Sequence, residues 1–245
     1  MDENWVLETS PWISYDLSNW EPLIRNLKPV LYKKKSFLFH QNDSAAFTCI
    51  VKSGRVRVTS FNIEGIEKQL YIAEAGCCIG EISCIMENPH AYSAIAIVDT
   101  LVYRITSSEI IEAIRNDWEL NKRVYNSVFR KMAVFQNHIL ELCFGQAIER
   151  IARLLLNLCK QYGADEPDGC RIAIHFTHSD VASMVNTSRV TVSNIFTWLM
   201  DNGYLHRQDR YFVVDSTEKL ERIAEGGIDL NRYLGKAISK PSNLQ

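Results

Sequence analysis

The spacing of apolar residues changes along the chain, and each change predicts a different kind of structure. From residue 30 to residue 106, short apolar runs with a period near two are separated by turn-forming pairs such as Ser53-Gly54 and Glu64-Gly65. Many short strands at close spacing indicate a small antiparallel barrel or jelly roll. The predicted strands cover residues 36–40, 48–51, 55–61, 67–73 and 94–105.

A long amphipathic helix is predicted over residues 118–142. Its apolar positions follow a heptad spacing, which favours pairing with a second copy of the same helix. The predicted seam contains Val128, Met132, Phe135, Ile139 and Leu142. The alternative is a core helix that packs only on its own barrel. Phe144 and Gly145 are a candidate hinge, and a second amphipathic helix is predicted over 147–159.

Residues 177–200 predict two short helices joined at the tight break Asn186-Thr187. Ser188 lies just before the second helix and is a natural N-cap. A predicted strand at 171–176 precedes this pair, and a predicted hairpin over 204–215 follows it, as in a winged helix-turn-helix. The apolar faces of the two helices are formed by Val181, Ala182 and Val185 and by Val192, Ile195, Phe196 and Leu199.

The second helix is the predicted reader of DNA bases. A helix-turn-helix places this helix in the major groove and reads bases with its N-terminal residues. Its first turns carry hydrogen-bond donors, small hydroxyls and one apolar contact residue, the types that reach base edges and phosphates. The predicted base and backbone contacts are Ser188, Arg189, Val190, Thr191, Ser193 and Asn194. Thr177 and His178, at the start of the first helix, are expected to contact phosphate. The alternative is an ordinary helical hairpin with a solvated face.

Composition adds only a few constraints. The 245 residues are 47% hydrophobic and 23% charged, which is typical of a globular protein of about two domains. No apolar run is long enough to span a bilayer, and the acidic start of the chain is not a signal peptide, so we expect a cytoplasmic protein without a membrane partner. The net charge of −2 predicts weak non-specific DNA affinity that depends on a few well-placed cations.

Several motifs resemble the cyclic-AMP receptor protein and fumarate-nitrate regulator (Crp/Fnr) family of bacterial transcription regulators. Its recognition helix opens with Ser-Arg-x-Thr-Val-[Ser/Gly], and residues 188–193 match that pattern. In the barrel, Ser53-Gly54-x-Val56-x-Val58 resembles a strand of cyclic-nucleotide-type barrels, and Gly80-Glu81 resembles their Gly-Glu corner. The resemblance covers roughly residues 25–225.

The resemblance implies an α+β fold whose domains follow one another in a defined order along the chain. An N-terminal antiparallel β-barrel of the cyclic-nucleotide-binding jelly-roll type, with a helical lead-in, would occupy 1–116. A dimerisation helix would occupy 117–144, a winged helix-turn-helix 145–225 and a tail 226–245. It also implies that the protein is an effector-responsive homodimer that binds a near-palindromic site in double-stranded DNA. The resemblance further implies that the protein is not an enzyme. RNA polymerase is a candidate partner.

One departure from the family bears on the effector. Cyclic-nucleotide binders of the family carry an Arg-Ser about ten residues after the Gly-Glu corner, where the arginine clamps the cyclic phosphate. The matching place here reads Tyr92-Ser93. We therefore expect a small organic effector, aromatic or acidic, and not cyclic AMP. Another group, the oxygen sensors, has N-terminal cysteines for an iron-sulfur centre, whereas the first cysteine here is Cys49.

The predicted effector pocket contains Gly80, Glu81, Tyr92, Ser93 and Lys131. Tyr92 with Lys131 resembles the arrangement of the halophenol-sensing members, in which tyrosine contacts the ring and lysine pairs with a phenolate. The structural alternatives are a solvated Lys131, a barrel side chain for Tyr92, and a capping or ion-pairing role for Glu81.

Two other functions and one redox role remain as alternatives. A cupin-like metal enzyme would need converging histidines, yet the barrel region has only His40 and His90 and no H-x-H. A ligand-sensing module that acts through protein contacts would leave the recognition helix unexplained. The cysteines Cys77, Cys78 and Cys84 would form a thiol switch if one were exposed with a lowered pKa.

Overall fold

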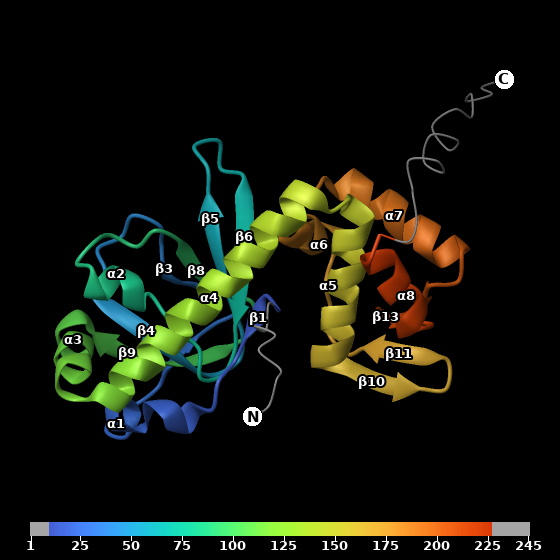
Figure 1. Cartoon of the computed structure of the whole chain (residues 1–245). Helices are drawn as coiled ribbons and strands as arrows, with labels where there is room; N and C mark the ends of the chain where they lie inside the picture. Colours follow the sequence, from blue (N-terminus) through green and yellow to red (C-terminus); the bar gives the residue numbers. More distant parts are fainter. Residues whose placement is uncertain (1–9, 227–245) are drawn as a thin grey trace. The chain divides into compact units, whose positions relative to one another are not determined.

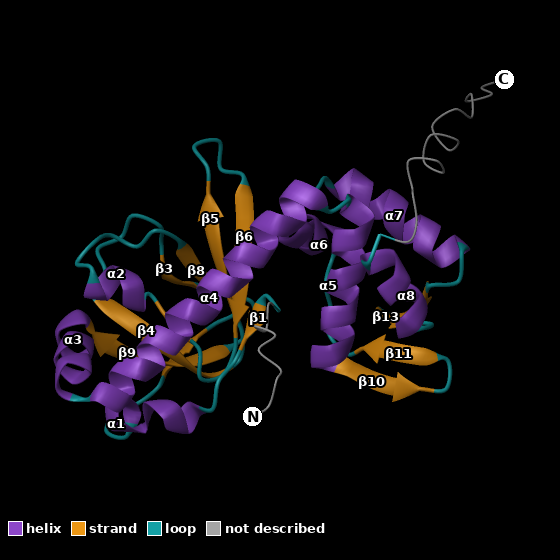
Figure 2. Cartoon of the chain, viewed as in Figure 1, coloured by secondary structure: helices purple, strands orange, loops and turns teal. Residues whose placement is uncertain are grey.

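The computed structural model describes residues 10–226 in two compact units, Met1–His138 and Ile139–Gln245 (Figures 1 and 2). The first nine residues of the predicted lead-in and nearly all of the predicted tail lie outside the described residues. The lead-in from residue 10 onward combines a short strand, a 3-10 turn and one turn of helix, β1 (Trp12–Ile13), η1 (Leu17–Trp20) and α1 (Glu21–Ile24).

Two β-sheets enclose one apolar core in the first unit. The five-stranded sheet has the order β1-β6-β5-β8-β3, and the four-stranded sheet has the order β2-β9-β4-β7. All pairings are antiparallel except the short pairing of β1 with β6. Both sheets contribute to the same core, for example through Val58 and Val102. The strands are β2 (Val30–Tyr32), β3 (Phe37–Phe39), β4 (Phe47–Ser53), β5 (Val56–Phe61), β6 (Glu67–Ala73), β7 (Cys78–Ile79), β8 (Ser93–Ala96) and β9 (Thr100–Thr106).

The strand predicted over 94–105 was wrong as a single element, because the chain bends between β8 and β9. Asp99 holds the bend by accepting a hydrogen bond from the backbone N–H of Lys34 at 2.9 Å and one from Lys33 Nζ at 2.8 Å. β8 then pairs in one sheet and β9 in the other. This corner connects the two sheets of the jelly roll. The apolar pattern of the sequence does not reveal this corner, because the strands on both sides of it are apolar.

Three helices follow or interrupt the strands. The short α2 (Glu81–Ile85) begins directly after the Gly-Glu corner and was not predicted. α3 (Ser107–Asn116) begins at a capping box between Thr106 and Glu109. The long helix α4 (Trp118–Phe144) is confirmed, two residues longer than predicted at its C-terminal end.

The exposed apolar residues of α4 differ in part from the predicted seam. Met132, Ile139 and Leu142 are exposed, at 57%, 59% and 38%. Val128 is half-buried, and Phe135 packs against the core of the first unit. Two further aromatic residues continue the exposed strip, Tyr125 and Phe129. The helix therefore has one apolar side on its own domain and a second apolar side uncovered within the single chain.

Between residues 147 and 226, the second unit combines four helices with a small sheet of order β10-β11-β13-β12. The predicted loop 163–169 is largely β10, which forms a hairpin with β11. α8 was not predicted. The elements are α5 (Ala147–Tyr162), β10 (Gly163–Glu166), β11 (Gly169–Ile172), α6 (His178–Val185), α7 (Arg189–Asp201), β12 (Leu205–Gln208), β13 (Tyr211–Val214) and α8 (Thr217–Ala224).

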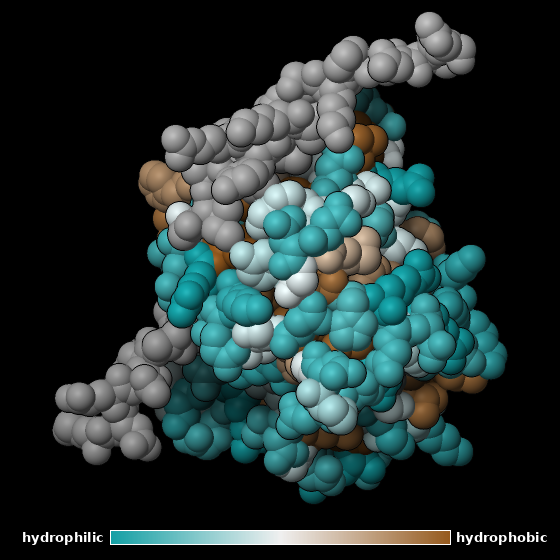
Figure 3. Space-filling model, turned by 90° about the vertical axis from the view of Figure 1, so that its right-hand side faces the viewer, coloured by the Kyte–Doolittle hydropathy of each residue, from teal (hydrophilic) through white to brown (hydrophobic). Residues whose placement is uncertain are grey.

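The strand predicted over 171–176 ends at Ile172 in the structure, because the following residues lead into α6. The face of the molecule turned to the viewer in Figure 3 is mainly hydrophilic, with only scattered apolar residues. Among residues 10–226, no helix is long and apolar enough to cross a membrane.

Candidate functional site

The predicted helix-turn-helix is confirmed as α6 and α7, joined by a turn of three residues. Asn186 ends α6 in the left-handed conformation, with φ of 52°, which asparagine tolerates better than most residues. The hydroxyl of Ser188 accepts a hydrogen bond from the backbone N–H of Thr191 at 3.0 Å and so caps α7 as predicted. The two apolar faces meet in the domain core, where Val192, Ile195, Phe196 and Leu199 are fully buried.

The opposite face of α7 is open to solvent. Arg189 and Asn194 are exposed, and Val190 is 69% exposed. Thr197, one turn beyond Asn194, extends this face and was missed by the sequence analysis, although its i+3 spacing is the signal that would have found it. Ser193 is half-buried. This face therefore offers one cation, one amide and one apolar side chain at the start of the helix.

Three of the predicted contact residues already have hydrogen-bond partners in the protein. The hydroxyl of Thr191 lies 2.8 Å from the hydroxyl of Ser188. Thr177 forms a capping box with Asp180: its hydroxyl donates to the carboxylate at 2.7 Å and accepts from the backbone N–H at 3.1 Å. These hydroxyls therefore shape the two helix starts in the absence of DNA.

His178 packs into the domain more than the sequence suggested. Its ring lies 4.9 Å from the ring of Phe196, between centroids, so it bridges α6 and α7. Burial lowers the pKa of His178, and the nearby charges of Arg189 and Arg207 lower it further. The imidazole is therefore neutral at neutral pH and adds no positive charge to this face.

Arg150 on α5 holds the turn of the helix-turn-helix and was missed by the sequence analysis. Its Nε donates to the carbonyl of Val185 at 2.9 Å, and its guanidinium also donates to the carbonyl of Gly145 at 2.5 Å. An arginine at the C-terminal end of α6 satisfies a carbonyl that the helix itself leaves unpaired. The same guanidinium thus joins this turn to the residue that follows α4.

The small sheet supplies two exposed cations beside the helix pair. Arg207 and Arg210 lie in or next to the β12–β13 hairpin and are exposed. The base of the hairpin is held by a hydrogen bond between the ring of His206 and the carboxylate of Asp215. Its apolar side is anchored by Phe212, whose ring lies 5.1 Å from that of Phe196. The hairpin therefore has a fixed base and a cationic tip.

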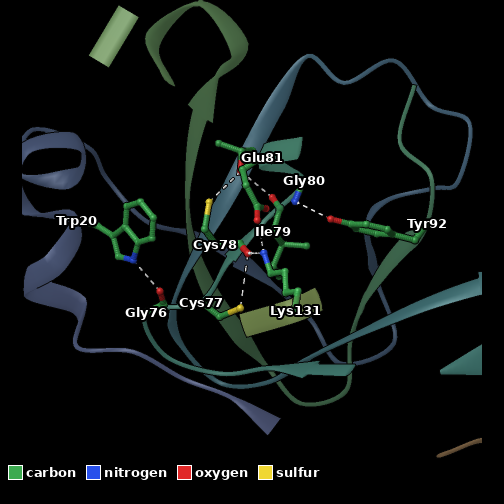
Figure 4. A network of polar contacts seen from close by, with 10 residues as sticks. Trp20, Gly76, Cys77, Cys78, Ile79, Gly80, Glu81, Tyr92 and Lys131 are labelled. Carbon is green, nitrogen blue, oxygen red and sulfur yellow. Dashed lines mark hydrogen bonds and ion pairs between the residues drawn. The ribbon is translucent and has the colours of Figure 1, made fainter. Parts of the chain in front are cut away.

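A second candidate site is a buried polar cluster in the first unit (Figure 4). The ammonium group of Lys131 contacts the carboxylate of Glu81 and donates to the carbonyl of Cys78 at 2.6 Å. The side chains of Lys131 and Glu81 are only 2% and 0% exposed. Burial is the largest influence and disfavours the charged form of Lys131, but the surrounding groups, Glu81 first, together outweigh it and raise the pKa of Lys131 overall. Lys131 is therefore charged and buried against Glu81, and it is not solvated.

Tyr92 lies in the same cluster. Its hydroxyl accepts a hydrogen bond from the backbone N–H of Gly80 at 3.2 Å, and its ring packs edge-on against Tyr71 at 6.5 Å. Burial and the charge of Glu81 raise the pKa of Tyr92 to about 12, so the phenol keeps its proton. Gly80 adopts φ of 87°, and a Cβ there would lie 2.9 Å from the ring of His90. The corner therefore requires glycine.

The predicted pocket residues are brought together with one exception. Gly80, Glu81, Tyr92 and Lys131 lie side by side in Figure 4. Ser93 instead accepts a hydrogen bond from the backbone N–H of Gln41 at 2.9 Å, because neighbouring residues of a strand point to opposite sides. Tyr71, which is fully buried beside Tyr92, was not among the predicted residues.

The three cysteines proposed as a thiol switch do not meet the stated conditions. Cys77, Cys78 and Cys84 are buried, and burial raises the pKa of each thiol. A buried thiol with a raised pKa is a poor nucleophile. Among residues 10–226, no cluster of three or more histidine, cysteine or acidic side chains is placed to hold a metal ion.

Comparison with known proteins gives the class of the chain. Residues 29–117 match the cyclic nucleotide-binding domain, and residues 149–223 match the Crp-like helix-turn-helix domain. The cAMP-activated global transcriptional regulator CRP of Salmonella typhimurium is 30% identical over 189 residues, which cover 76% of this chain and 89% of that protein. The chain therefore belongs to the Crp/Fnr family, whose members are transcription regulators and not enzymes.

Two further similarities agree with this membership. The CRP-like cAMP-activated global transcriptional regulator of Mycobacterium tuberculosis is 23% identical over 202 residues, which cover 82% of this chain and 90% of that protein. The structure of a CooA mutant from Carboxydothermus hydrogenoformans superposes with a TM-score of 0.70 at 23% identity, covering 83% of this chain and 90% of that one. The second similarity concerns the fold alone.

Proposed function

We propose that this regulator binds a near-palindromic DNA site as a homodimer and responds to a small organic effector other than cyclic AMP. The observation that carries the DNA-binding part is the Ser188-capped helix α7, whose first turns expose Arg189, Val190 and Asn194. Recruitment of RNA polymerase is a further expectation, because transcription regulators of this class act at promoters.

Arg189 is the proposed base-reading residue. An arginine at the start of a recognition helix can donate two hydrogen bonds to guanine O6 and N7. Val190 has no polar group and can only make apolar contact, for example with a thymine methyl. Arg207 and Arg210 are proposed to contact phosphates from the hairpin. With so few cations, affinity would depend on placement more than on overall charge.

The exposed strip of α4 supports a homodimer. Tyr125, Phe129, Met132 and Ile139 leave a contiguous apolar side uncovered, and a second copy of the same helix would cover it through the symmetric contact of a two-fold axis. Two DNA-binding domains related in this way read two half-sites about one helical turn apart.

The buried cluster supports an effector without a phosphate. Lys131 is already neutralised by Glu81, and Tyr92 occupies the place of the family's phosphate-clamping arginine. A buried phosphate would therefore bring a negative charge with no added counter-charge, which is costly. The ring of Tyr92 lies 6.1 Å from that of Phe39 and 6.5 Å from that of Tyr71, between centroids, and such rings favour an aromatic ligand.

Selection of binding sites from random double-stranded DNA tests the proposal. We expect an enriched inverted repeat with half-sites one turn apart and an A·T pair opposite Val190. A strongly selected G·C pair at that position would overturn the reading of Val190. If the folded, dimeric protein enriches no motif, the alternative function is favoured, in which the protein senses a ligand and acts through protein contacts.

Light scattering tests the dimer separately from DNA. Phe129→Glu places a charge in the exposed apolar strip, and Asn126→Glu makes a comparable change at an exposed polar position of α4. We expect a dimer mass for the wild type and for Asn126→Glu, and a monomer mass for Phe129→Glu. A dimer that survives Phe129→Glu with unchanged stability would place the interface elsewhere.

A further inference from the structure

Two cysteines of the second unit have side chains in contact with each other. Cys159 lies on α5 and Cys170 on β11, and the two thiols form a side-chain hydrogen bond. Both are partly exposed, in contrast to the four fully buried cysteines of the first unit. Cys143 is also exposed, but among residues 10–226 it has no cysteine partner. Cys159 and Cys170 are therefore the thiols placed for reaction with each other.

The backbone at Gly163 brings the two cysteines together. A Cβ at this position would lie 2.2 Å from the carbonyl oxygen of Cys159 and 2.5 Å from the sulfur of Cys170. Only glycine allows the start of β10 to pass this close to both residues. Because β10 pairs with β11, this close passage fixes Cys170 against the end of α5.

Both cysteines line a surface hollow of about 600 Å³, which is large enough for a small reagent. The hollow lies within the second unit, between the end of α5, the β10–β11 hairpin and the start of α8, and its other lining residues include Asp165, Asp215 and Glu218. It is separate from the exposed face of α7. Neither the DNA-reading role nor the effector cluster uses these cysteines.

We propose that Cys159 and Cys170 form a reversible disulfide when the protein meets a hydroperoxide. The thiolate of one cysteine attacks the O–O bond, which breaks to give a sulfenic acid and an alcohol or water. The second thiol then attacks the sulfenic sulfur, the S–S bond forms, and water leaves. In balance, two thiols and one hydroperoxide give one disulfide, one alcohol and one water. A dithiol reverses the reaction by two-electron reduction.

Either thiol can react first, because the two side chains contact each other and both cysteines line the hollow. The disulfide would join the end of α5 to β11 and close a short loop that contains β10. Since β11 pairs with β13, the bond would also brace the sheet that carries the hairpin beside α7.

Peptide mapping of the full-length protein tests the proposal without any variant. After treatment with one equivalent of hydrogen peroxide, we expect a linked pair of peptides containing Cys159 and Cys170, lighter by two hydrogen atoms than the separate peptides. Thiol titration should fall from seven free cysteines to five, and dithiothreitol should restore seven. Recovery of both cysteines as separately alkylated thiols, under conditions that oxidise Cys143, would overturn the proposal.

Two variants give a second readout that does not depend on DNA binding. Cys170→Ser should abolish the linked peptides and give oxidised Cys159 or no product, whereas Cys143→Ser should leave the linkage intact. The oxidised wild type should melt a few degrees above the reduced protein, because a disulfide limits the unfolded chain. Loss of the Cys159–Cys170 linkage in Cys143→Ser, or a disulfide to Cys143 as the main product in the wild type, would contradict the assignment.

Discussion

The ammonium group of Lys131 is buried against the carboxylate of Glu81, fifty residues away in sequence. The pair joins α4 to the Gly-Glu corner inside the first unit. Removal of one member leaves a buried charge without its partner, whereas removal of both leaves none.

A double-mutant cycle tests this relationship. We expect Lys131→Met alone and Glu81→Gln alone each to lower the free energy of unfolding by about 3–5 kcal/mol, and the double variant to lose much less than the sum. Urea unfolding of the four proteins measures it. Additive losses would mean that the two side chains do not form a charged pair in solution.

Arg189→Ala tests base reading by α7. The loss of a two-hydrogen-bond base contact should weaken binding to the selected site by about 1–3 kcal/mol and relax the preference at one position. Fluorescence anisotropy with the selected and a scrambled duplex measures both effects. Arg115→Ala, at an exposed position of α3, is the matched control and should change neither. An unchanged ratio of the two affinities would show that Arg189 contacts only phosphate.

Calorimetry tests the proposed effector class. We expect no useful affinity for cyclic AMP and measurable binding by members of a phenol panel, with Tyr92→Phe changing the phenol affinity. Micromolar cyclic-AMP binding that survives Tyr92→Phe would contradict the proposal. Because Glu81 already neutralises Lys131, we expect phenols to bind best below their own pKa, as neutral molecules. Stronger binding above that pKa, lost in Lys131→Ala, would instead show that the phenolate displaces Glu81.

His90 predicts a pH dependence of stability. It is 1% exposed, and both ring nitrogens are without a hydrogen-bond partner among residues 10–226. Burial lowers the pKa of His90 below the ordinary 6.5. A base with a lowered pKa in the folded state contributes stability above its unfolded pKa, and this stability is lost as the pH falls through the folded pKa.

Thermal unfolding between pH 7.5 and pH 5 measures this effect. We expect the melting temperature of the wild type to fall further over this range than that of His90→Phe. Equal slopes for the wild type and His90→Phe would show that His90 is not the titrating group. At pH 7.5 His90→Phe should be at least as stable, because it removes two unpaired nitrogens.

The parts of the fold that local spacing determines could be predicted from the sequence. Ser188 caps α7 through the backbone N–H three residues on, and the apolar faces of α6 and α7 follow the helical repeat. The hairpin that begins at Gly163 could not be predicted, because β10 carries no buried apolar residue that would signal a strand. Its stability comes from pairing with β11, which is a tertiary effect.

The candidate sites show the same division. The exposed start of α7 follows from sequence alone. The partner of Lys131 does not, because sequence spacing carries no information about a contact across fifty residues. Arg150 gave no signal either: a cation on an amphipathic helix usually faces solvent, and here its partners are backbone carbonyls, which every residue has.

The contacts of Arg150 link two segments of the DNA-binding domain that are far apart in sequence. One guanidinium is hydrogen-bonded both to Gly145, just after α4, and to Val185, at the end of α6. A rotation applied at Gly145 would therefore reach the turn before the recognition helix without first bending α5. A substitution of Arg150 would then change the sensitivity to the effector, although Arg150 is proposed to contact neither the effector nor DNA. Selection could therefore adjust the response without changing the specificity for the effector or for DNA.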